Sequence, residues 1–183
     1  MRRKLRNFGL ALLALAALSG SALLDYYLPE HSVTTITGVE VKLVDKDGPI
    51  SRQNPADQPV RDMYLIYTQH AIDDVRVYRN EDTGWGWPFY FKFDASDVQA
   101  TANALANARQ PAYLTSYGWR INMLSLYPNV TDVRLAVAGE ATWSFFRWFW
   151  FTLWFALLAA AGWGLLRATR RQPDDKPSGQ TGA

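Results

Sequence analysis

The stretch WFWFTLWFALLAAAGWGLL, residues 148–166, decides the architecture that we expect for this chain. It holds about 19 residues without a charge, close to the length at which an α-helix crosses the apolar core of a bilayer. Arg147 precedes it, at a place where a long basic side chain can reach the lipid headgroups. A core helix of a soluble protein is the alternative, but such helices rarely stay apolar on every face for this length. We therefore predict a transmembrane helix within residues 143–167.

A second apolar run, FGLALLALAALSGSALL, occupies residues 8–24. With about 17 uncharged residues it is at the lower limit for crossing a bilayer, and Tyr26 and Tyr27 follow it as interfacial aromatic residues do. Residues 8–27 are accordingly predicted to form a transmembrane helix. The basic start and the small residues from Ser19 to Ala22 also suit a cleaved signal peptide. Both interpretations export the residues that follow.

Basic residues flank both apolar runs on their outer sides. They are Arg2, Arg3, Lys4 and Arg6 before the first run, and Arg167, Arg170 and Arg171 after the second. Because Lys and Arg are retained on the cytoplasmic side of a membrane, we predict that both termini are cytoplasmic. Residues 1–7 then form a short basic segment, and residues 168–183 form a disordered tail without large apolar side chains. Residues 28–142 become an extracytoplasmic domain.

The charge of the middle of the chain excludes one class of partner. From Asp25 to Glu140 the chain carries 10 basic and 15 acidic residues. Proteins that bind nucleic acid present a basic face, so we expect no nucleic-acid partner. The chain has no cysteine, which excludes disulfides, thiolate metal sites and a cysteine nucleophile.

The middle of the chain is rich in stretches typical of β-strands. In residues 33–44 (VTTITGVEVKLV) the apolar residues Val39, Val41 and Leu43 alternate with polar ones, as in a strand with one buried face. Other β-branched or aromatic runs are also expected to form strands. They cover residues 63–68, 75–78, 89–93, 112–117, 119–127 and 130–137.

One helix is predicted among these strands. Ser96-Asp97-Val98-Gln99 matches a capping box, in which the serine and glutamine side chains satisfy free amides at the start of a helix. Apolar residues then recur at helical spacing in a narrow stripe, and Pro111 ends the pattern. The stripe consists of Val98, Ala102, Leu105 and Ala106. We predict an α+β fold, a mainly antiparallel sheet with one packed helix between two transmembrane helices, and the pattern is compatible with closure into a barrel.

Three stretches in order resemble one family of bacterial membrane proteins. They are VTTITGVEVK, VRVYRNEDTGWGWPFYFKFDASDVQA and SYGWRINMLSLYPNVTDVRL. Together they resemble the domain of unknown function 1523 family, over residues 31–137 and the first apolar run. The resemblance implies a bacterial inner-membrane protein with a periplasmic domain, and it brings no activity or catalytic residue. We claim no family pattern for the second apolar run.

The residues capable of catalysis or metal binding form no recognisable motif. His31 and His70 lie in unrelated contexts without a spaced carboxylate partner, so neither a metal site nor a cofactor is predicted. Glu81 and Asp82 are the acid/base candidates if the domain is an enzyme. If the domain is instead a non-enzymatic binding module, we expect no catalytic residue.

Two aromatic clusters are the most unusual feature of the domain. Trp85 and Trp87 lie in a Gly84–Pro88 loop, and a second cluster comprises Tyr117, Trp119 and Arg120. Exposed, these groups can stack on a sugar, a lipid headgroup or a protein side chain. Buried, they would form corners of the core. A third interpretation places the tryptophans in the lipid headgroup layer.

Two hypotheses for function remain open. The first is a non-enzymatic binding module of the cell envelope that uses Trp85, Trp87, Tyr117, Trp119 and Arg120. Its expected partners are the bilayer together with an envelope protein, a lipid headgroup or a glycan, and a second copy of the chain through small residues at 159–164. The second is a periplasm-facing hydrolase of envelope glycans that depends on carboxylates such as Glu81 and Asp82.

Overall fold

The computed structural model describes residues 2–45, 48–51, 53–55, 59–71 and 73–169, so the predicted tail from residue 170 lies outside the described residues. The chain divides into two compact units. One unit combines Met1–Ala22 with Phe151–Ala183 and is helical where it is described. The other, Leu23–Trp150, contains the sheet and the ends of both long helices.

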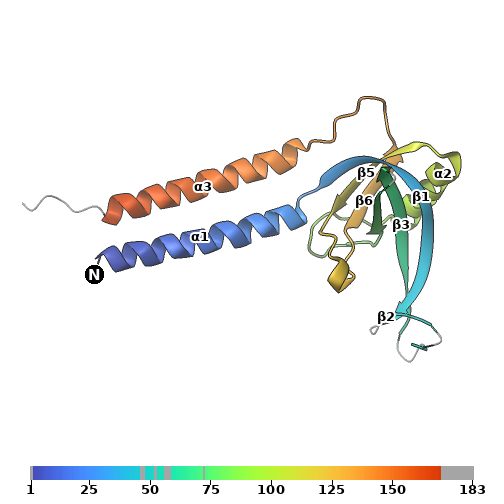
Figure 1. Cartoon of the computed structure of the whole chain (residues 1–183), viewed down its shortest axis with the longest axis horizontal. Coiled ribbons are helices and arrows are strands. Elements are labelled where there is room, and N and C mark those ends of the chain that lie inside the picture. The colour runs from blue at the N-terminus through green and yellow to red at the C-terminus, as the bar shows by residue number, and fades with distance from the viewer. Residues whose placement is uncertain (1, 46–47, 52, 56–58, 72, 170–183) are drawn as a thin grey trace, which may run out of the picture. The chain divides into compact units, whose positions relative to one another are not determined.

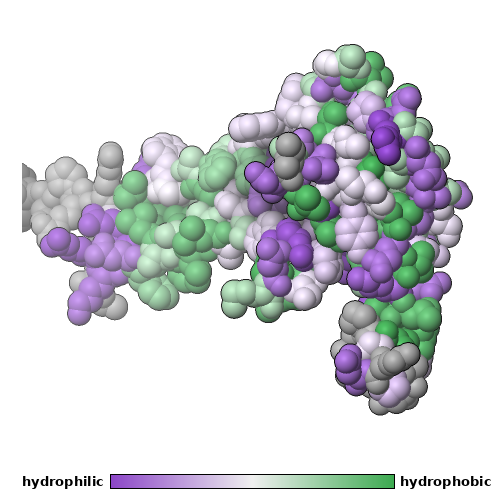
Figure 2. All heavy atoms as spheres, turned by 45° about the vertical axis from the view of Figure 1, so that its right-hand side comes forward, coloured by the Kyte–Doolittle hydropathy of each residue, from purple (hydrophilic) through white to green (hydrophobic). Residues whose placement is uncertain are grey.

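The helical unit is built from two long apolar helices. They are α1 (Arg2–Tyr27) and α3 (Phe145–Thr169), with 26 and 25 residues. Both are long and apolar enough to cross a membrane, and their most apolar windows are not buried inside the protein. Figure 2 shows them as mostly green, with purple residues at the end where α1 begins. The two predicted apolar helices are therefore present.

Large side chains of α3 pack against small residues of α1. The Trp154 ring lies against Gly20, where any side chain would overlap it, and its Nε1 donates a hydrogen bond to Ser21 Oγ at 3.3 Å. Leu165 occupies the corresponding place beside Gly9. The small residues that also suited a signal peptide thus have a packing role in this structure.

The other unit is a small closed barrel of mixed strands (Figure 1). Its strands are β1 (Glu30–Asp45), β3 (Arg61–Ala71), β4 (Asp74–Arg79), β6 (Asn129–Leu135) and β5 (Pro111–Tyr117), in that order around the ring. A short β2 (Gly48–Pro49) pairs with the end of β1. All pairings are antiparallel except the contact of β4 with β6. The predicted α+β class and mainly antiparallel sheet are confirmed, and the sheet is closed.

The length of β1 explains the closure. Its first part, Glu30–Thr35, pairs with β5, and the part from Thr35 to Val44 pairs with β3. Between Ile36 and Gly38 the register shifts, which is the mark of a β-bulge. A bulge bends the strand and increases its twist, so one strand can complete both edges of the ring.

The core lies between the barrel wall and α2 (Ala95–Ala108). Its buried members come from several strands and from one face of the helix. They are Ile36, Ile66, Tyr78, Val98, Ala102, Ala112, Leu114, Val130 and Val133. The predicted helical stripe is confirmed, since Val98 and Ala102 are buried while Leu105 and Ala106 pack at the edge of the cluster.

The predicted capping box is wrong. The helix begins at Ala95, and the N–H of that residue donates to Asp82 Oδ1 at 2.9 Å. Gln99 does not reach back to the start of the helix; it is buried and donates to the Leu65 carbonyl at 3.3 Å. A carboxylate distant in sequence therefore caps the positive end of the helix, and the local motif is not used.

Three strand predictions also need correction. Residues 89–93 are not paired in a sheet, and the stretch 119–127 holds a short 3₁₀ turn, Asn122–Leu124, closed by a bridge between Ile121 and Leu126. In β1, Val41 and Leu43 are more than half exposed. These two residues lie in the part of β1 beyond its pairing with β5, where the face that carries their side chains is left open to solvent in the described part of the chain.

Candidate functional site

The end of α1 is the place where the two predicted aromatic clusters meet. The ring of Tyr27 lies 5.1 Å from that of Trp87, and the ring of Tyr26 lies 5.3 Å from that of Trp119. Tyr26 and Tyr27 also contact each other edge to face. The sequence predicted these two tyrosines as interfacial residues but carried no signal that they join two loops far apart in the chain.

The segment after Gly84 carries a row of exposed aromatic side chains. We call Trp85, Trp87, Phe89, Phe91 and Phe93 the aromatic row. Every member is more than half exposed, and Trp85 reaches 79%. The rings form one connected cluster, with contacting centroids 5.2–6.1 Å apart, in which Trp85 contacts Phe91 and Phe93. From Phe89 to Phe93 the side chains alternate between exposed and covered positions, and the exposed ones are the apolar rings.

Two alternate residues of the same segment point inward and hold it. Tyr90 stacks on Tyr117 with ring centroids 4.7 Å apart, and its hydroxyl donates to the Tyr27 carbonyl at 2.6 Å. Lys92 is buried, and its Nζ donates to the Val130 carbonyl at 2.7 Å and to Asn80 Oδ1. These anchors explain why the aromatic row is left on the surface.

Lys92 belongs to a buried polar network. Burial lowers the pKa of Lys92 to about 8, against the opposing effect of carboxylates that include Asp94 and Asp82. The amide of Asn80 donates to the Ala95 carbonyl at 2.7 Å and to Gln99 Oε1 at 3.1 Å. The network thus connects the aromatic segment to α2 and to the barrel wall.

A groove of about 440 Å³ lies beside the second cluster. Trp119 and Arg120 line it together with Arg76, Tyr78 and Glu30. The Trp119 Nε1 donates to Asp25 Oδ2 at 2.8 Å, and the Arg120 guanidinium donates to the Leu126 carbonyl at 2.9 Å. A groove with an indole wall and two arginines suits a ligand with a flat or apolar part and a negative charge.

The predicted binding residues therefore occupy three environments. Trp85 and Trp87 belong to the aromatic row, and Trp119 and Arg120 line the groove. Tyr117 is buried and supports both, because it stacks on Tyr90 and its hydroxyl accepts a hydrogen bond from Asn129 Nδ2 at 3.2 Å.

An ion pair joins the two helix ends next to the groove. Arg147, in the first turn of α3, pairs with the carboxylate of Asp25 in the last turns of α1. Its guanidinium also donates to the Leu28 carbonyl at 3.3 Å. Asp25 therefore serves both Arg147 and Trp119, a role that the sequence did not reveal.

The two acid/base candidates already have structural partners. Glu81 pairs with Arg79 at 3.3 Å and with Arg61 at 4.0 Å, and its backbone N–H donates to Asn129 Oδ1 at 2.8 Å. Asp82 caps α2, as described above. Both carboxylates thus stabilise the loop between β4 and α2.

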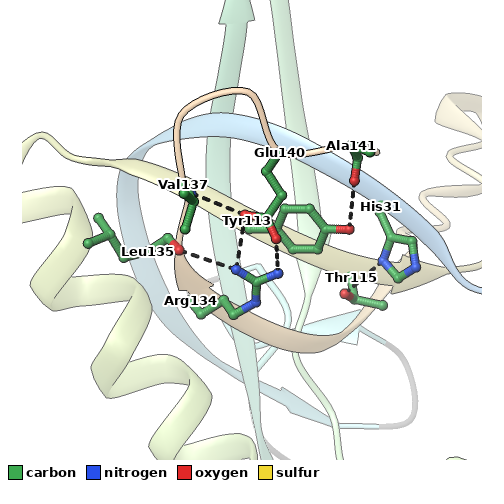
Figure 3. Close-up of polar contacts among 8 residues, drawn as sticks. All are labelled: His31, Tyr113, Thr115, Arg134, Leu135, Val137, Glu140 and Ala141. Atoms are coloured by element: carbon green, nitrogen blue, oxygen red, sulfur yellow. Dashed lines mark hydrogen bonds and ion pairs between the residues drawn. The ribbon is translucent and has the colours of Figure 1, made fainter. Parts of the chain in front are cut away.

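His31 lies in a different cluster, which secures the connection from β6 to α3 (Figure 3). Its Nδ1 is 3.0 Å from Thr115 Oγ1, its ring stacks on Tyr113, and burial lowers its pKa. The Arg134 guanidinium lies over the Tyr113 ring, 4.1 Å from the ring centroid, and donates a hydrogen bond to the Glu140 carboxylate at 3.0 Å. Within the described residues no group of three or more His, Cys, Asp or Glu is placed to hold a metal ion.

Comparisons with known proteins place the chain. The family model described as "Protein of unknown function (DUF1523)" matches residues 5–170, so the match includes α3, for which no family pattern was claimed. A Haemophilus influenzae protein described as uncharacterized is 43% identical over 148 residues, covering 78% of this chain and 85% of the relative. No solved structure matches the chain. The chain belongs to the DUF1523 family.

Proposed function

We propose that this protein is a module of the bacterial cell envelope, held in the inner membrane by α1 and α3 with its barrel in the periplasm. The support is the apolar length of both helices and the basic residues at their outer ends. Arg3, Lys4 and Arg6 lie in the first turns of α1, and Arg167 lies in the last turn of α3. Basic residues at these positions favour the cytoplasmic side for both ends.

The absence of cysteine makes this topology easy to test. Single cysteines at Val41 and at Leu5, both exposed, are treated with a membrane-impermeant maleimide in spheroplasts. Labelling of Val41→Cys in intact spheroplasts, with Leu5→Cys labelled only after lysis, is the expected result. The reverse pattern would contradict the topology, and release of the protein by alkaline carbonate would contradict the anchoring.

The barrel acts, in this proposal, as a non-enzymatic binding module. The observation that carries it is the exposure of large aromatic side chains, above all Trp85 and Trp87 at 79% and 63%, next to a groove that presents Trp119 and two arginines. Large aromatic residues are usually mostly buried, and exposed ones are typical of binding surfaces. The hydrolase hypothesis has less support, because Glu81 and Asp82 are engaged in ion pairing and helix capping.

Site-specific photo-crosslinking in living cells tests the binding proposal. A benzophenone amino acid at Trp119 should give a discrete adduct with an envelope protein, glycan or lipid, and the same probe at Val41 should not. Arg76→Gln removes a charge from the groove and should weaken the adduct, whereas Arg109→Gln, a charge change at the end of α2, should not. Equal adducts from Trp119 and Val41, or no adduct from Trp119, would contradict the proposal.

A further inference from the structure

We propose that the aromatic row lies in the lipid headgroup layer of the same membrane that α1 and α3 enter, so that lipid is the partner of this surface. The inference rests on the proposed function only for the anchoring of the helices. It assigns a second role to the domain, which is to rest on the bilayer through five aromatic side chains.

The end of α1 sets the height of the row. Tyr27 is the last residue of α1, and its ring is 5.1 Å from the ring of Trp87. The hydroxyl of Tyr90, within the row segment, donates to the Tyr27 carbonyl at 2.6 Å. The headgroup layer on each side of a bilayer is about 5–7 Å thick. A helix that leaves the membrane at Tyr27 therefore holds Trp87 within that layer.

The first turns of α3 also indicate that this part of the domain lies at the headgroup layer. Arg147 is paired with Asp25, so within the barrel unit the last turns of α1 and the first turn of α3 are joined. Aromatic residues at the start of α3, including Phe145, Phe146 and Trp148, are exposed in the same unit. Tryptophan and tyrosine are enriched where membrane helices meet the interface, and the row is likewise rich in large aromatic side chains.

The chemistry of the row favours lipid over water. Between Gly84 and Phe93 the charged residue is Lys92, and its side chain is turned into the barrel. The exposed side consists of indole and phenyl rings, and the phenyl rings have no polar group to hydrate. Phe91 also has a left-handed backbone, φ 51°, which is uncommon for a bulky residue, and its side chain is exposed. An apolar, uncharged surface at the height of the headgroups is therefore expected to contact the bilayer.

Spin labels measure the depth of the row directly. The full-length chain, with single cysteines at Trp85, Phe89 or Phe91, is labelled with a nitroxide and reconstituted into vesicles of equal parts phosphatidylethanolamine and phosphatidylglycerol. Collision rates with oxygen, which enters lipid, and with a water-soluble nickel chelate are compared. Val41→Cys is the matched control, because it is an exposed apolar position eleven residues along β1 from Glu30, tens of Å distant in an extended strand.

We expect an oxygen-to-chelate collision ratio several-fold higher at the row positions than at Val41. Row labels as accessible to the chelate as the Val41 label would overturn the inference. Row labels shielded from both reagents would also overturn it, in favour of contact with protein. If carbonate releases the protein from membranes, the anchoring itself fails; if the protein stays anchored and the ratio is low, the lipid contact alone fails.

Discussion

The far end of β1, residues 39–44, and the aromatic row segment, residues 85–93, both present apolar side chains to the surface. They are held in different ways. The end of β1 is held by its backbone ladder, since Val39 to Val44 pair residue by residue with β3. The row segment has no partner strand among the described residues. It is held by a few turn hydrogen bonds, such as that from the Gly84 N–H to the Lys92 carbonyl, and by the side chains of Tyr90 and Lys92. A segment that lacks a strand ladder and depends on two inward side chains is the more sensitive to single substitutions.

The largest effect is expected from the residue that holds Lys92. Asn80→Ala removes a fully buried amide and its hydrogen bonds to Lys92, Ala95 and Gln99. We expect the free energy of unfolding to fall by about 4 kcal/mol, since a lost hydrogen bond costs about 1 kcal/mol and one to a charged group about 2 kcal/mol. Chemical denaturation of the detergent-solubilised protein measures it. Asn107→Ala, at an exposed position, is the control and should change little.

A second pair of variants tests the two parts of β1. Ile36→Ala opens a cavity in the core and should cost about 3 kcal/mol, whereas Val41→Ala at the exposed end should cost less than about 0.5 kcal/mol. Denaturation of both proteins under the same conditions gives the comparison. Similar losses for the two variants would mean that the end of β1 is covered in the folded protein.

The pH dependence of stability tests the buried amine. Burial lowers the pKa of Lys92 to about 8 from the ordinary value of 10.5, so between these values the unfolded chain binds more protons than the folded one. The free energy of unfolding should therefore rise with pH above about 8, by about 2 kcal/mol over the window. Denaturation between about pH 7 and 9.5 measures this rise and stays below the ordinary tyrosine pKa of about 10.

Lys92→Met is the matched variant for this experiment. It should show no rise over the same pH range, because it removes the titrating amine. The upper limit on pH matters because burial raises the pKa of Tyr90, and a raised tyrosine pKa lowers stability above the ordinary value. A rise of equal size in wild type and variant would show that another group causes it.

The smallest effect is expected where the row segment meets α1. Tyr90→Phe keeps the stacking on Tyr117 and removes only the hydrogen bond to the Tyr27 carbonyl. The expected loss is about 1 kcal/mol, the usual net contribution of one hydrogen bond. A nitroxide at Trp87 should also become more mobile in this variant, while a nitroxide at Val41 should not.

Part of the candidate site was predictable because its signals are local. Trp85, Trp87, Trp119 and Arg120 stood out as aromatic or basic residues in Gly-containing loops, and all four are at least partly exposed. The sequence did not reveal Tyr117 as a buried support, because burial depends on Tyr90 stacking on it from another segment. The inward direction of Lys92 was equally hidden, since a buried lysine needs acceptors that only the folded barrel supplies.

The sequence by itself determined the class of the molecule. The length of the two apolar runs, the alternation in the strand regions, the helical stripe of α2 and the family membership all follow from order and composition along the chain. Each is a local property, because the period of a strand or helix and the length of an apolar run do not depend on distant residues.

The tertiary structure alone decided what these elements do together. Barrel closure depends on β1 pairing with two strands, the cap of α2 comes from Asp82, and the aromatic clusters meet because Tyr26 and Tyr27 lie between them. Alternation states that a segment has two faces, but which face is covered depends on what the rest of the chain brings against it. For the aromatic row, the polar side is covered by the barrel and the aromatic side is left for a partner.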